Sequence, residues 1–408
     1  MKENHSSTGA AIAPDSPCLE IPQAVRDLEV RVARSPEQID EVRQAWSRLS
    51  QHRDSDIDFC AQIIWAREGV IRPHVIQVYR DGEPAVLLVG RLERHRMISK
   101  IGYLKLPGVA AQALAFPYGG LLGKASSEDC KEIVSSLLAS LRDGEADLAI
   151  LDHLPVGTPF HDYALQIPGF ASRDCLAKPE VHYAMTLPMD IKEVYASLSS
   201  NHRSDLKRKS KKLLAEHQDK VEVRCYRSTD ELEELIRNAE AIARKTYQRG
   251  LGVGFQDTDE IRKRLRLAAE KGWLRAYVLF LSGAPAAFWI GDLYRSIFCS
   301  DYLAFDPVFT PLSPGTYLLM KTVEEFCATG VGKIDFGFGE ARYKEQFGNS
   351  PSNEATVLIF SPRAKGMLLN GMRTMTGLAE NLVRKTLDRA RLLPTLKKFW
   401  RSRLANQN

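Results

Sequence analysis

Two stretches with the same pattern decide the fold: VIQVYRDGEPAVLLVGRL at residues 75–92 and AYVLFLSGAPAAFWIGDL at residues 276–293. Each has two apolar runs around a glycine-containing turn, and each second run carries a glycine near its end. Asp81-Gly82 and Ser282-Gly283 favour tight β-hairpin turns, because glycine tolerates the positive φ that such turns require. The recurrence predicts an internal duplication of one α/β unit.

The segments around the two hairpins follow a similar order. A strand at 28–33 and helices at 36–49 and 57–66 precede the first hairpin, and a helix at 127–141 and a strand at 148–153 follow it. Helices at 230–249 and 258–271 precede the second hairpin, and a strand at 296–302, a helix at 315–329 and a strand at 333–338 follow it. Apolar periodicity therefore predicts an α/β fold of two tandem lobes, each a central mixed sheet flanked by helices.

Length and composition are those of a globular protein. The 408 residues leave room for two to three domains at about 100–200 residues each. With 44% apolar and 26% charged residues, the chain is neither globally disordered nor collagen-like nor a coiled coil. Its apolar runs are far shorter than the ~20 residues that cross a bilayer, and residues 1–20 lack the apolar core of a secretory signal. Seven scattered cysteines fit a reducing compartment, so we expect a cytoplasmic protein.

Composition also divides the chain into four segments. We predict a disordered leader at 1–22, an N-terminal lobe at 23–187, a C-terminal lobe at 188–362 and a basic helical tail at 363–408. The tail has eleven Lys and Arg against two acidic residues, a net charge of +9, whereas the whole chain has +5. Apolar residues recur at helical spacing in 367–393, and a basic amphipathic helix can lie on anionic lipid. Association with the inner face of the plasma membrane is one hypothesis for the tail, and a solvated tail is the other.

The first candidate site is the start of the predicted helix at 315–329. Ser313, Pro314 and Gly315 precede or open this helix, and Thr316 and Tyr317 follow them. A helix N-terminus presents unpaired N–H groups and a positive dipole end, and glycine lets an anion approach the backbone. This pattern favours a pyrophosphate site, although an ordinary capped helix has the same sequence features.

The second candidate site is the segment DFGFGEARYK at residues 335–344. Its glycines end a strand, so Glu340, Tyr343 and Lys344 are expected at the carboxyl end of a sheet strand, where sites of α/β proteins usually form. Asp335, on the strand itself, is a candidate for binding substrate. A carboxylate, a phenol and an ammonium can supply a general base, a general acid and charge stabilisation.

The third candidate is the basic segment YASLSSNHRSDLKRKSKKL at residues 195–213. On a helix, Leu206 and Leu213 would face the body of the protein while most basic side chains point outward. Arg203 and Lys207 are candidates for binding an anionic part of a substrate, and a solvated basic face is the alternative. Histidines and cysteines show no metal-ligand spacing, so we predict no metal.

Together the three segments resemble the GNAT-superfamily acyltransferases of the CelD type, often called the FemAB-like acetyltransferase domain. The resemblance covers roughly residues 28–360 and is strongest at 190–348. The matching residues are Trp46, Leu49, Tyr195, Leu198, Ser199, Arg203, Leu206, Lys207, Arg208, Ser313, Pro314, Gly315, Asp335, Gly339, Tyr343 and Lys344. One departure is that the family's glycine-rich pyrophosphate loop is reduced here to Ser-Pro-Gly, which leaves the identity of the acyl donor open.

The resemblance implies two GNAT-like lobes and transfer of an acyl group from acyl-CoA, usually acetyl-CoA, to an amine or hydroxyl. Such acceptors belong to a sugar, an exopolysaccharide or a cell-envelope precursor. The donor pyrophosphate would bind at Ser313, Gly315, Thr316 and Tyr317, in the C-terminal lobe. We expect direct transfer in a ternary complex, with Glu340 or Asp301 as the base and Tyr343 and Lys344 completing the catalytic group.

Two other functions fit the same residues. The related Fem ligases transfer an aminoacyl group from aminoacyl-tRNA to peptidoglycan precursors, and the charge at 207–212 is suited to RNA. No long helical insertion of the tRNA-using kind is visible in the sequence, so we do not expect nucleic acid as a partner. A non-catalytic glycan-associated scaffold is the third function that the sequence permits.

Overall fold

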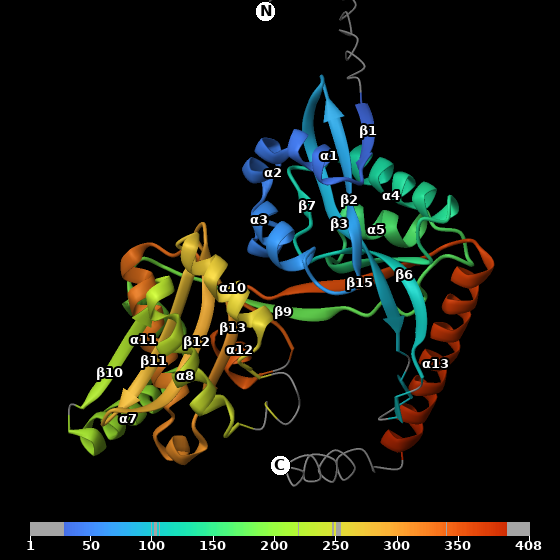
Figure 1. The fold of residues 1–408 in the computed structure, drawn as a ribbon. Helices are drawn as coiled ribbons and strands as arrows, with labels where there is room; N and C mark the ends of the chain where they lie inside the picture. The colour runs from blue at the N-terminus through green and yellow to red at the C-terminus, as the bar shows by residue number, and fades with distance from the viewer. Residues whose placement is uncertain are drawn as a thin grey trace, which may run out of the picture.

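The computed structural model describes residues 28–98, 100–101, 104–105, 107–218, 220–246, 249, 254–339 and 341–389. Two α/β halves lie side by side and share one sheet (Figure 1). The sheet has the strand order β1-β2-β3-β6-β8-β15-β9-β14-β13-β12-β11-β10, and β7 pairs with β3. The predicted α/β fold of two lobes is confirmed, and the predicted leader at 1–22 lies outside the described residues.

The N-terminal half contains the first hairpin and the elements around it. Its strands are β1 (Leu28–Ala33), β2 (Val70–Arg80), β3 (Glu83–Met97), β4 (Lys100–Ile101), β5 (Leu104–Lys105), β6 (Val109–Phe116), β7 (Leu121–Leu122) and β8 (Leu148–Pro155). Its helices are α1 (Pro36–Glu41), α2 (Arg43–Leu49), η1 (Arg53–Ser55), α3 (Ile57–Phe59), η2 (Cys60–Ile64), α4 (Ser127–Arg142) and α5 (Pro159–Gln166). The helix expected at 36–49 is divided at Val42, whose ψ of 6° is not helical.

The C-terminal half repeats this arrangement around the second hairpin. Its strands are β9 (Glu180–Thr186), β10 (Val221–Tyr226), β11 (Leu274–Leu281), β12 (Ala284–Tyr294), β13 (Ile297–Phe305), β14 (Lys333–Phe338) and β15 (Ser352–Phe360). Its helices are α6 (Ile191–Ser197), α7 (Ser200–His217), η3 (Thr229–Glu231), α8 (Leu232–Ala243), α10 (Asp259–Glu270), η4 (Pro307–Leu312), α11 (Pro314–Thr329) and α12 (Arg342–Phe347). Helix α13 (Ala364–Arg389) follows.

The two hairpin turns have the same backbone conformation. Asp81 and Gly82 have φ values of 52° and 80°, and Ser282 and Gly283 have 51° and 83°. Two successive residues with positive φ define the tight turn that matches the twist of the flanking strands. After each hairpin a third strand pairs with the second, a helix crosses, and a parallel strand follows: β6 with β8, and β13 with β14. The predicted duplication is therefore visible in the backbone.

The two halves exchange strands. β9 lies within the predicted N-terminal lobe at 23–187 but pairs with β14, while β15 lies within the predicted C-terminal lobe at 188–362 but pairs with β8. β9 and β15 also pair with each other at Ser352–Glu354, and this pairing joins the halves into one sheet (Figure 1). The boundary expected at 187/188 falls directly after β9, whose strand partners β14 and β15 both come later in the chain.

Separate apolar cores lie on the two halves. One includes Leu88, Phe116 and Leu137 beneath α4, and another includes Trp289, Leu318 and Phe326 beneath α11. A smaller cluster joins the halves, since Phe59 and Ile63 near η2 pack with Leu267 of α10. Among the described residues, no helix is long and apolar enough to span a bilayer.

Candidate active site

The site begins where two parallel strands diverge. β13 pairs with β14 only over Ile297–Cys299 and Lys333–Asp335. Beyond this point β13 stays with β12 up to Phe305, whereas β14 pairs with β9 on its other side. A register shift makes Asp301 an extra residue on β13, and such a bulge bends the strand locally. The edge of β13 beyond Cys299 is thus left without β14 as a partner.

A row of alternating carboxylates and imidazoles lies at this divergence. His182 on β9 places Nε2 2.5 Å from Asp335 Oδ1 and Nδ1 2.9 Å from Glu354 Oε1. Asp335 belongs to β14 and Glu354 to β15, so the exchanged strands build this row. All three side chains are buried, and the predicted substrate-binding residue Asp335 is thereby held by protein contacts.

His52, from the segment before η1, extends the row. Its Nε2 lies 3.7 Å from Asp335 Oδ2 and 3.5 Å from Cys299 Sγ. The backbone N–H of Asp54 donates to His52 Nδ1 over 3.2 Å. The Tyr118 ring contacts the edges of both imidazoles, with centroid distances of 4.8 Å to His52 and 5.0 Å to His182.

These contacts shift the pKa values of the row. Burial disfavours the imidazolium of His52, but the contacts with Asp335 and Cys299 outweigh burial and raise its pKa to about 10. Burial likewise opposes charge on His182, and Asp335 and Glu354 raise its pKa to about 9. The pKa of Asp335 is lowered, because the two histidines outweigh the effect of its burial. The Asp54 N–H donates to Nδ1, so this contact favours an imidazole whose proton is on Nε2 and opposes the rise in pKa.

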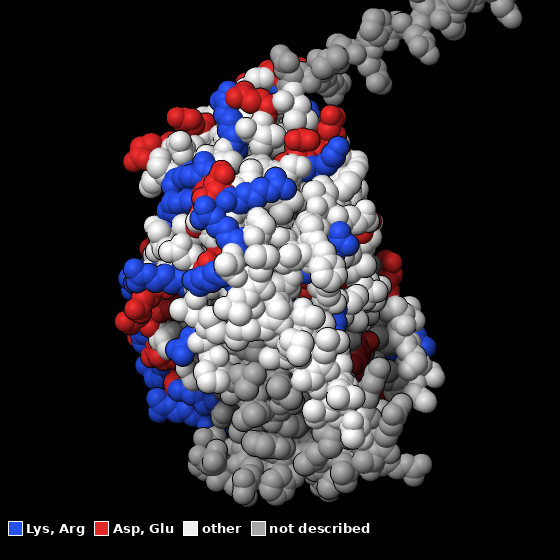
Figure 2. Space-filling view, turned by 90° about the vertical axis from the view of Figure 1, so that its right-hand side faces the viewer, with Lys and Arg blue, Asp and Glu red and all other residues white. Residues whose placement is uncertain are grey.

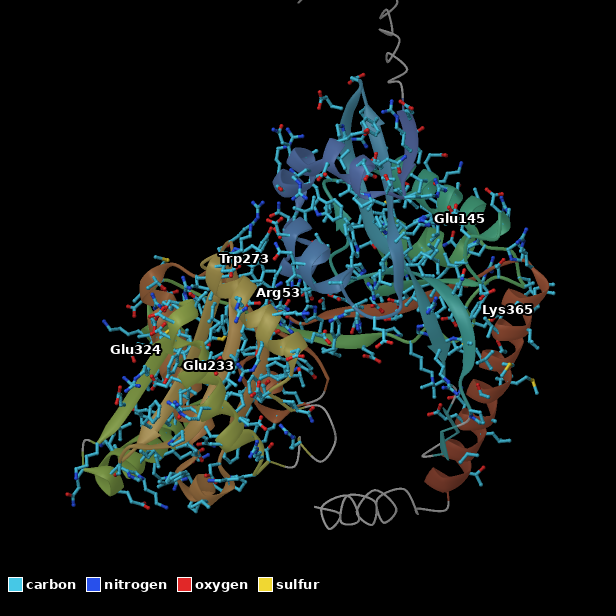
Figure 3. The ribbon with its side chains drawn as sticks, in the orientation of Figure 1. Arg53, Glu145, Glu233, Trp273, Glu324 and Lys365 are labelled. Atoms are coloured by element: carbon cyan, nitrogen blue, oxygen red, sulfur yellow. The ribbon has the colours of Figure 1, made fainter. Side chains whose placement is uncertain are left out.

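Arg53 joins the two halves beside this row (Figure 3). Its side chain is buried, and Nη1 lies 2.7 Å from Asp292 Oδ2 and 2.9 Å from Asp301 Oδ2. Arg264 also pairs with Asp301. Asp301, expected as a general base, therefore already accepts hydrogen bonds from Arg53 and forms an ion pair with Arg264, and its position favours structural pairing over proton transfer.

Two cavities meet at His52 and Asp335. The larger, of about 1090 Å³, lies in the N-terminal half and is lined by residues at the ends of β6 and β8 and by the loops that follow them. The smaller, of about 390 Å³, includes Cys299 and the divergence of β13 and β14. Both are lined by His52, Asp335 and Asp152, and burial raises the pKa of Asp152.

The expected pyrophosphate site lies at the start of α11. The N–H groups of Thr316 and Tyr317 both donate to the Ser313 carbonyl oxygen, over 3.1 and 3.2 Å, so they are partly satisfied by the protein. A Cβ on Gly315 would lie 3.4 Å from the Phe305 ring, which places the helix start beside the end of β13. The helix start and the unpaired edge of β13 thus adjoin each other.

The basic helix α7 runs along the same end of the C-terminal half. Lys212 Nζ lies 3.5 Å from the Pro311 carbonyl oxygen, just before α11, and the His202 ring lies 5.3 Å from that of Phe347 on α12. Leu206 and Leu213 are buried, as predicted. Lys207 is exposed, and Arg203 donates to the Tyr195 carbonyl oxygen over 3.3 Å.

Tyr343 and Lys344 lie on α12, next to the end of β14. Lys344 Nζ donates to the Phe338 carbonyl oxygen over 2.5 Å, and burial lowers its pKa against the opposing charge of Asp335. The Tyr343 ring packs edge-on against Phe336, with centroids 5.8 Å apart. Neither side chain is among those that line the two cavities. Glu340 lies outside the described residues.

Sequence reasoning did not identify His52, Arg53, Glu354 and Cys299 as site residues. The spacing of His182 from the other histidines and cysteines predicts no metal site. Its position gives the one visible signal, because an ionisable residue in the strand EVHYAMT is unusual unless a partner is present. Within the described part of the chain, no group of three or more His, Cys, Asp or Glu side chains is arranged to hold a metal ion.

Comparison with known proteins supports the interpretation of the C-terminal half. Residues 200–345 match the family Acetyltransf_6, described as an acetyltransferase (GNAT) domain. This match covers α7 to α12, including the diverging strands and the start of α11. The half therefore has a GNAT-type acyltransferase fold, as the sequence resemblance implied. No curated protein matches the chain in sequence.

A solved structure shares the fold over most of the chain. The crystal structure of FemX aligns with a TM-score of 0.56 and 13% identity, over 78% of this chain and 96% of FemX. A tandem GNAT protein from the clavulanic acid biosynthesis pathway aligns with a TM-score of 0.46 and 11% identity, over 82% of this chain and 100% of that one. Sequence identities this low show similarity of fold alone. The TM-score of the second alignment is too low for that alignment to support a conclusion. The CelD type stays a prediction.

Proposed function

We propose that this protein is an acyl-CoA-dependent acyltransferase that acylates an amine or hydroxyl of a sugar, exopolysaccharide or cell-envelope precursor. The observation that supports this most directly is the shared wall of the two cavities, formed by His52, Asp335 and Asp152. Two substrates that enter from the two halves would meet at this wall. Acetyl-CoA is the donor that the GNAT-type fold of residues 200–345 favours.

In this proposal the donor binds at the C-terminal half. Its thioester lies along the unpaired edge of β13, whose N–H groups can donate to the thioester carbonyl. Its pyrophosphate lies at the start of α11, where the Gly315 N–H and the helix dipole favour an anion. Lys207 and the neighbouring basic side chains of α7 add positive charge at the same end.

The acceptor occupies the cavity of about 1090 Å³, whose size suits a small organic molecule or one or two sugar units. Its polar wall at His52 and Asp152 faces the donor end. An acceptor amine or hydroxyl must lose a proton to attack the thioester. Asp152 is suited to take that proton, because its raised pKa makes it a stronger base than an ordinary carboxylate.

His52 is suited to act as the acid. With a pKa raised to about 10 it carries a proton at neutral pH and can deliver it to the departing thiolate. Asp335 contacts the imidazole, His182 holds Asp335, and Glu354 fixes His182 in turn. We assign positioning roles to these three residues and to Lys344, which fixes the end of β14 through the Phe338 carbonyl.

A thermal-shift screen of the full chain across acyl-CoAs tests the donor. A ligand at about 100 times its Kd stabilises the native state by about 2.7 kcal/mol, which is a shift of a few degrees for a chain of this size. The product assay then uses acetyl-CoA with amino sugars and monitors release of free thiol. Absence of both the shift and thiol release with every acyl-CoA would reject the proposal and favour a non-catalytic scaffold.

One observation favours a second candidate, an aminoacyl-tRNA-dependent ligase of the Fem type. The overall fold aligns with FemX, and α7 presents exposed basic side chains beside the donor end. RNA binding through α7 should weaken steeply as salt concentration rises. Salt-sensitive binding of tRNA together with no response to any acyl-CoA would support this candidate over the first.

A further inference from the structure

Within the described part of the chain, the contacts of helix α13 lie along one side of the helix. Leu369 is buried in a small core with Phe360 and Ala113, and Asn370 donates to the Ala171 carbonyl oxygen over 2.8 Å. Arg373 pairs with Asp174 at 2.9 Å. At the start of the helix, Lys365 pairs with Asp147 at 2.8 Å (Figure 3). These contacts fix which side of the helix points outward.

The outward side is apolar. Met367, Leu368, Met375, Leu378, Leu382 and Val383 are all exposed, from 38% for Val383 to 69% for Met375. Leu368, Met375 and Leu382 are seven residues apart, a spacing that places them on one side of a helix. Figure 2 views the molecule from the side of α13 and shows a broad area without charged side chains. An apolar strip of this kind on a surface marks an interaction site.

The sequence that follows this strip is strongly basic. Residues 384–408 contain eight Lys and Arg, and Asp388 is their one acidic residue. Phe399 and Trp400 lie within this basic segment, and aromatic residues of this kind concentrate at membrane–water interfaces. An apolar strip that is followed in sequence by a cluster of cations has the composition that binds anionic lipid.

We propose that the apolar side of α13 docks the protein on an anionic lipid surface, a partner that complements the positive charge of the sequence at 384–408. A second copy of this chain fits less well, because it would bring the same positive charge against the first. Lipid headgroups with negative charge complement the basic segment, while the acyl-chain boundary accepts the apolar strip. Docking here would leave both cavities free, since none of the six exposed apolar residues of α13 lines them.

Co-sedimentation of the full chain with vesicles tests the proposal. One set contains phosphatidylcholine alone, and the other contains equal parts of phosphatidylcholine and phosphatidylglycerol. We expect pelleting with the anionic vesicles, weaker pelleting with neutral ones, and a decrease as salt screens the charge. The assay needs no acyl transfer, so its outcome is independent of the proposed enzymatic function.

Two methionines provide a matched pair of variants. Met375→Asp removes an exposed side chain from the strip, and Met189→Asp removes one that is 72% exposed and distant from α13 in sequence. We expect Met375→Asp to lower the partition coefficient about tenfold, from the loss of one buried apolar side chain, and Met189→Asp to leave it unchanged. Both variants should melt at the wild-type temperature, because neither side chain is buried.

Three outcomes would overturn the proposal. The first is equal pelleting of the two variants, and the second is equal pelleting with neutral and anionic vesicles. The third is a dimer in sedimentation velocity that Met375→Asp dissociates, together with no pelleting of the wild type. That last result would identify the strip as an interface between copies of the chain.

Discussion

Arg53 is the residue whose removal tests how the two halves are held together. It is 5% exposed and contacts Asp292 and Asp301 of the other half as well as the neighbouring Asp54. Arg53→Ala would leave these carboxylates buried or half-buried without their main partner. Removing one member of a buried ion pair costs about 3–5 kcal/mol, because the remaining charge is desolvated and uncompensated.

The expected change in melting temperature follows from the size of the chain. Unfolding entropy is about 2.1 cal/mol/K per residue, which for 408 residues gives ~0.9 kcal/mol/K. A loss of about 3–5 kcal/mol therefore lowers Tm by about 4–6 °C. Differential scanning calorimetry measures this shift together with the unfolding enthalpy.

Arg67→Ala is the matched control. Arg67 also pairs with the other half, through Glu260 at 2.7 Å, but the two side chains are 43% and 56% exposed. Exposed pairs contribute about 0–1 kcal/mol, so its Tm should change by about a degree or less. Adding Asp292→Asn to Arg53→Ala should recover part of the loss, because one unpaired charge is removed. If Arg53→Ala melts no lower than Arg67→Ala, the buried pair does not hold the halves together.

Three further predictions concern the site, and a fourth concerns the packing of β12 against β13. Activity should fall as pH rises through about 10, because His52 then loses the proton that it donates. His52→Gln should remove this descending limb of the pH–rate profile and lower kcat by about a hundredfold or more. Asp152→Asn should instead remove the ascending limb of the pH–rate profile at low pH, since the base must be ionised to act. If the kcat profile of either variant matches that of the wild type, the role assigned to that residue is wrong. Lys344→Ala should cut turnover by roughly a hundredfold through displacement of the β14 carbonyl that it binds, and wild-type turnover would remove Lys344 from the mechanism. Gly291→Ala would place a Cβ 2.3 Å from a backbone oxygen of β13, so it should lower the free energy of unfolding, measured in urea, by about 1–3 kcal/mol. Gly371→Ala is the control, because open space surrounds Gly371 and this variant should not destabilise the protein.

The elements that could be predicted are those set by neighbouring residues. The turns at Asp81-Gly82 and Ser282-Gly283 were predicted because their conformation depends on the glycine and its neighbour alone. Strand β14 was predicted with its observed bounds, since glycines follow its apolar run and mark where the strand ends. Helix α11 starts one residue earlier than expected, at Pro314, which is favoured in a first helical turn.

Partner choice between distant strands could not be predicted. Nothing local in the sequence around β9 specifies that it pairs with β14, or that β15 returns to β8. The site depends on this choice, because His182 and Glu354 reach Asp335 only through the exchanged strands. The sequence therefore indicated the donor end, whose motif is continuous, but not the histidine row, whose members come from separate elements.

The strand exchange also bears on how the protein is made. The N-terminal half cannot complete its sheet until β15, which ends at Phe360, has left the ribosome. Until then β8 presents a bare edge to other nascent chains, and such edges promote aggregation. A chain divided between residues 187 and 188 should therefore yield two insoluble fragments when each is made alone, and a functional enzyme only when both are synthesised in the same cell.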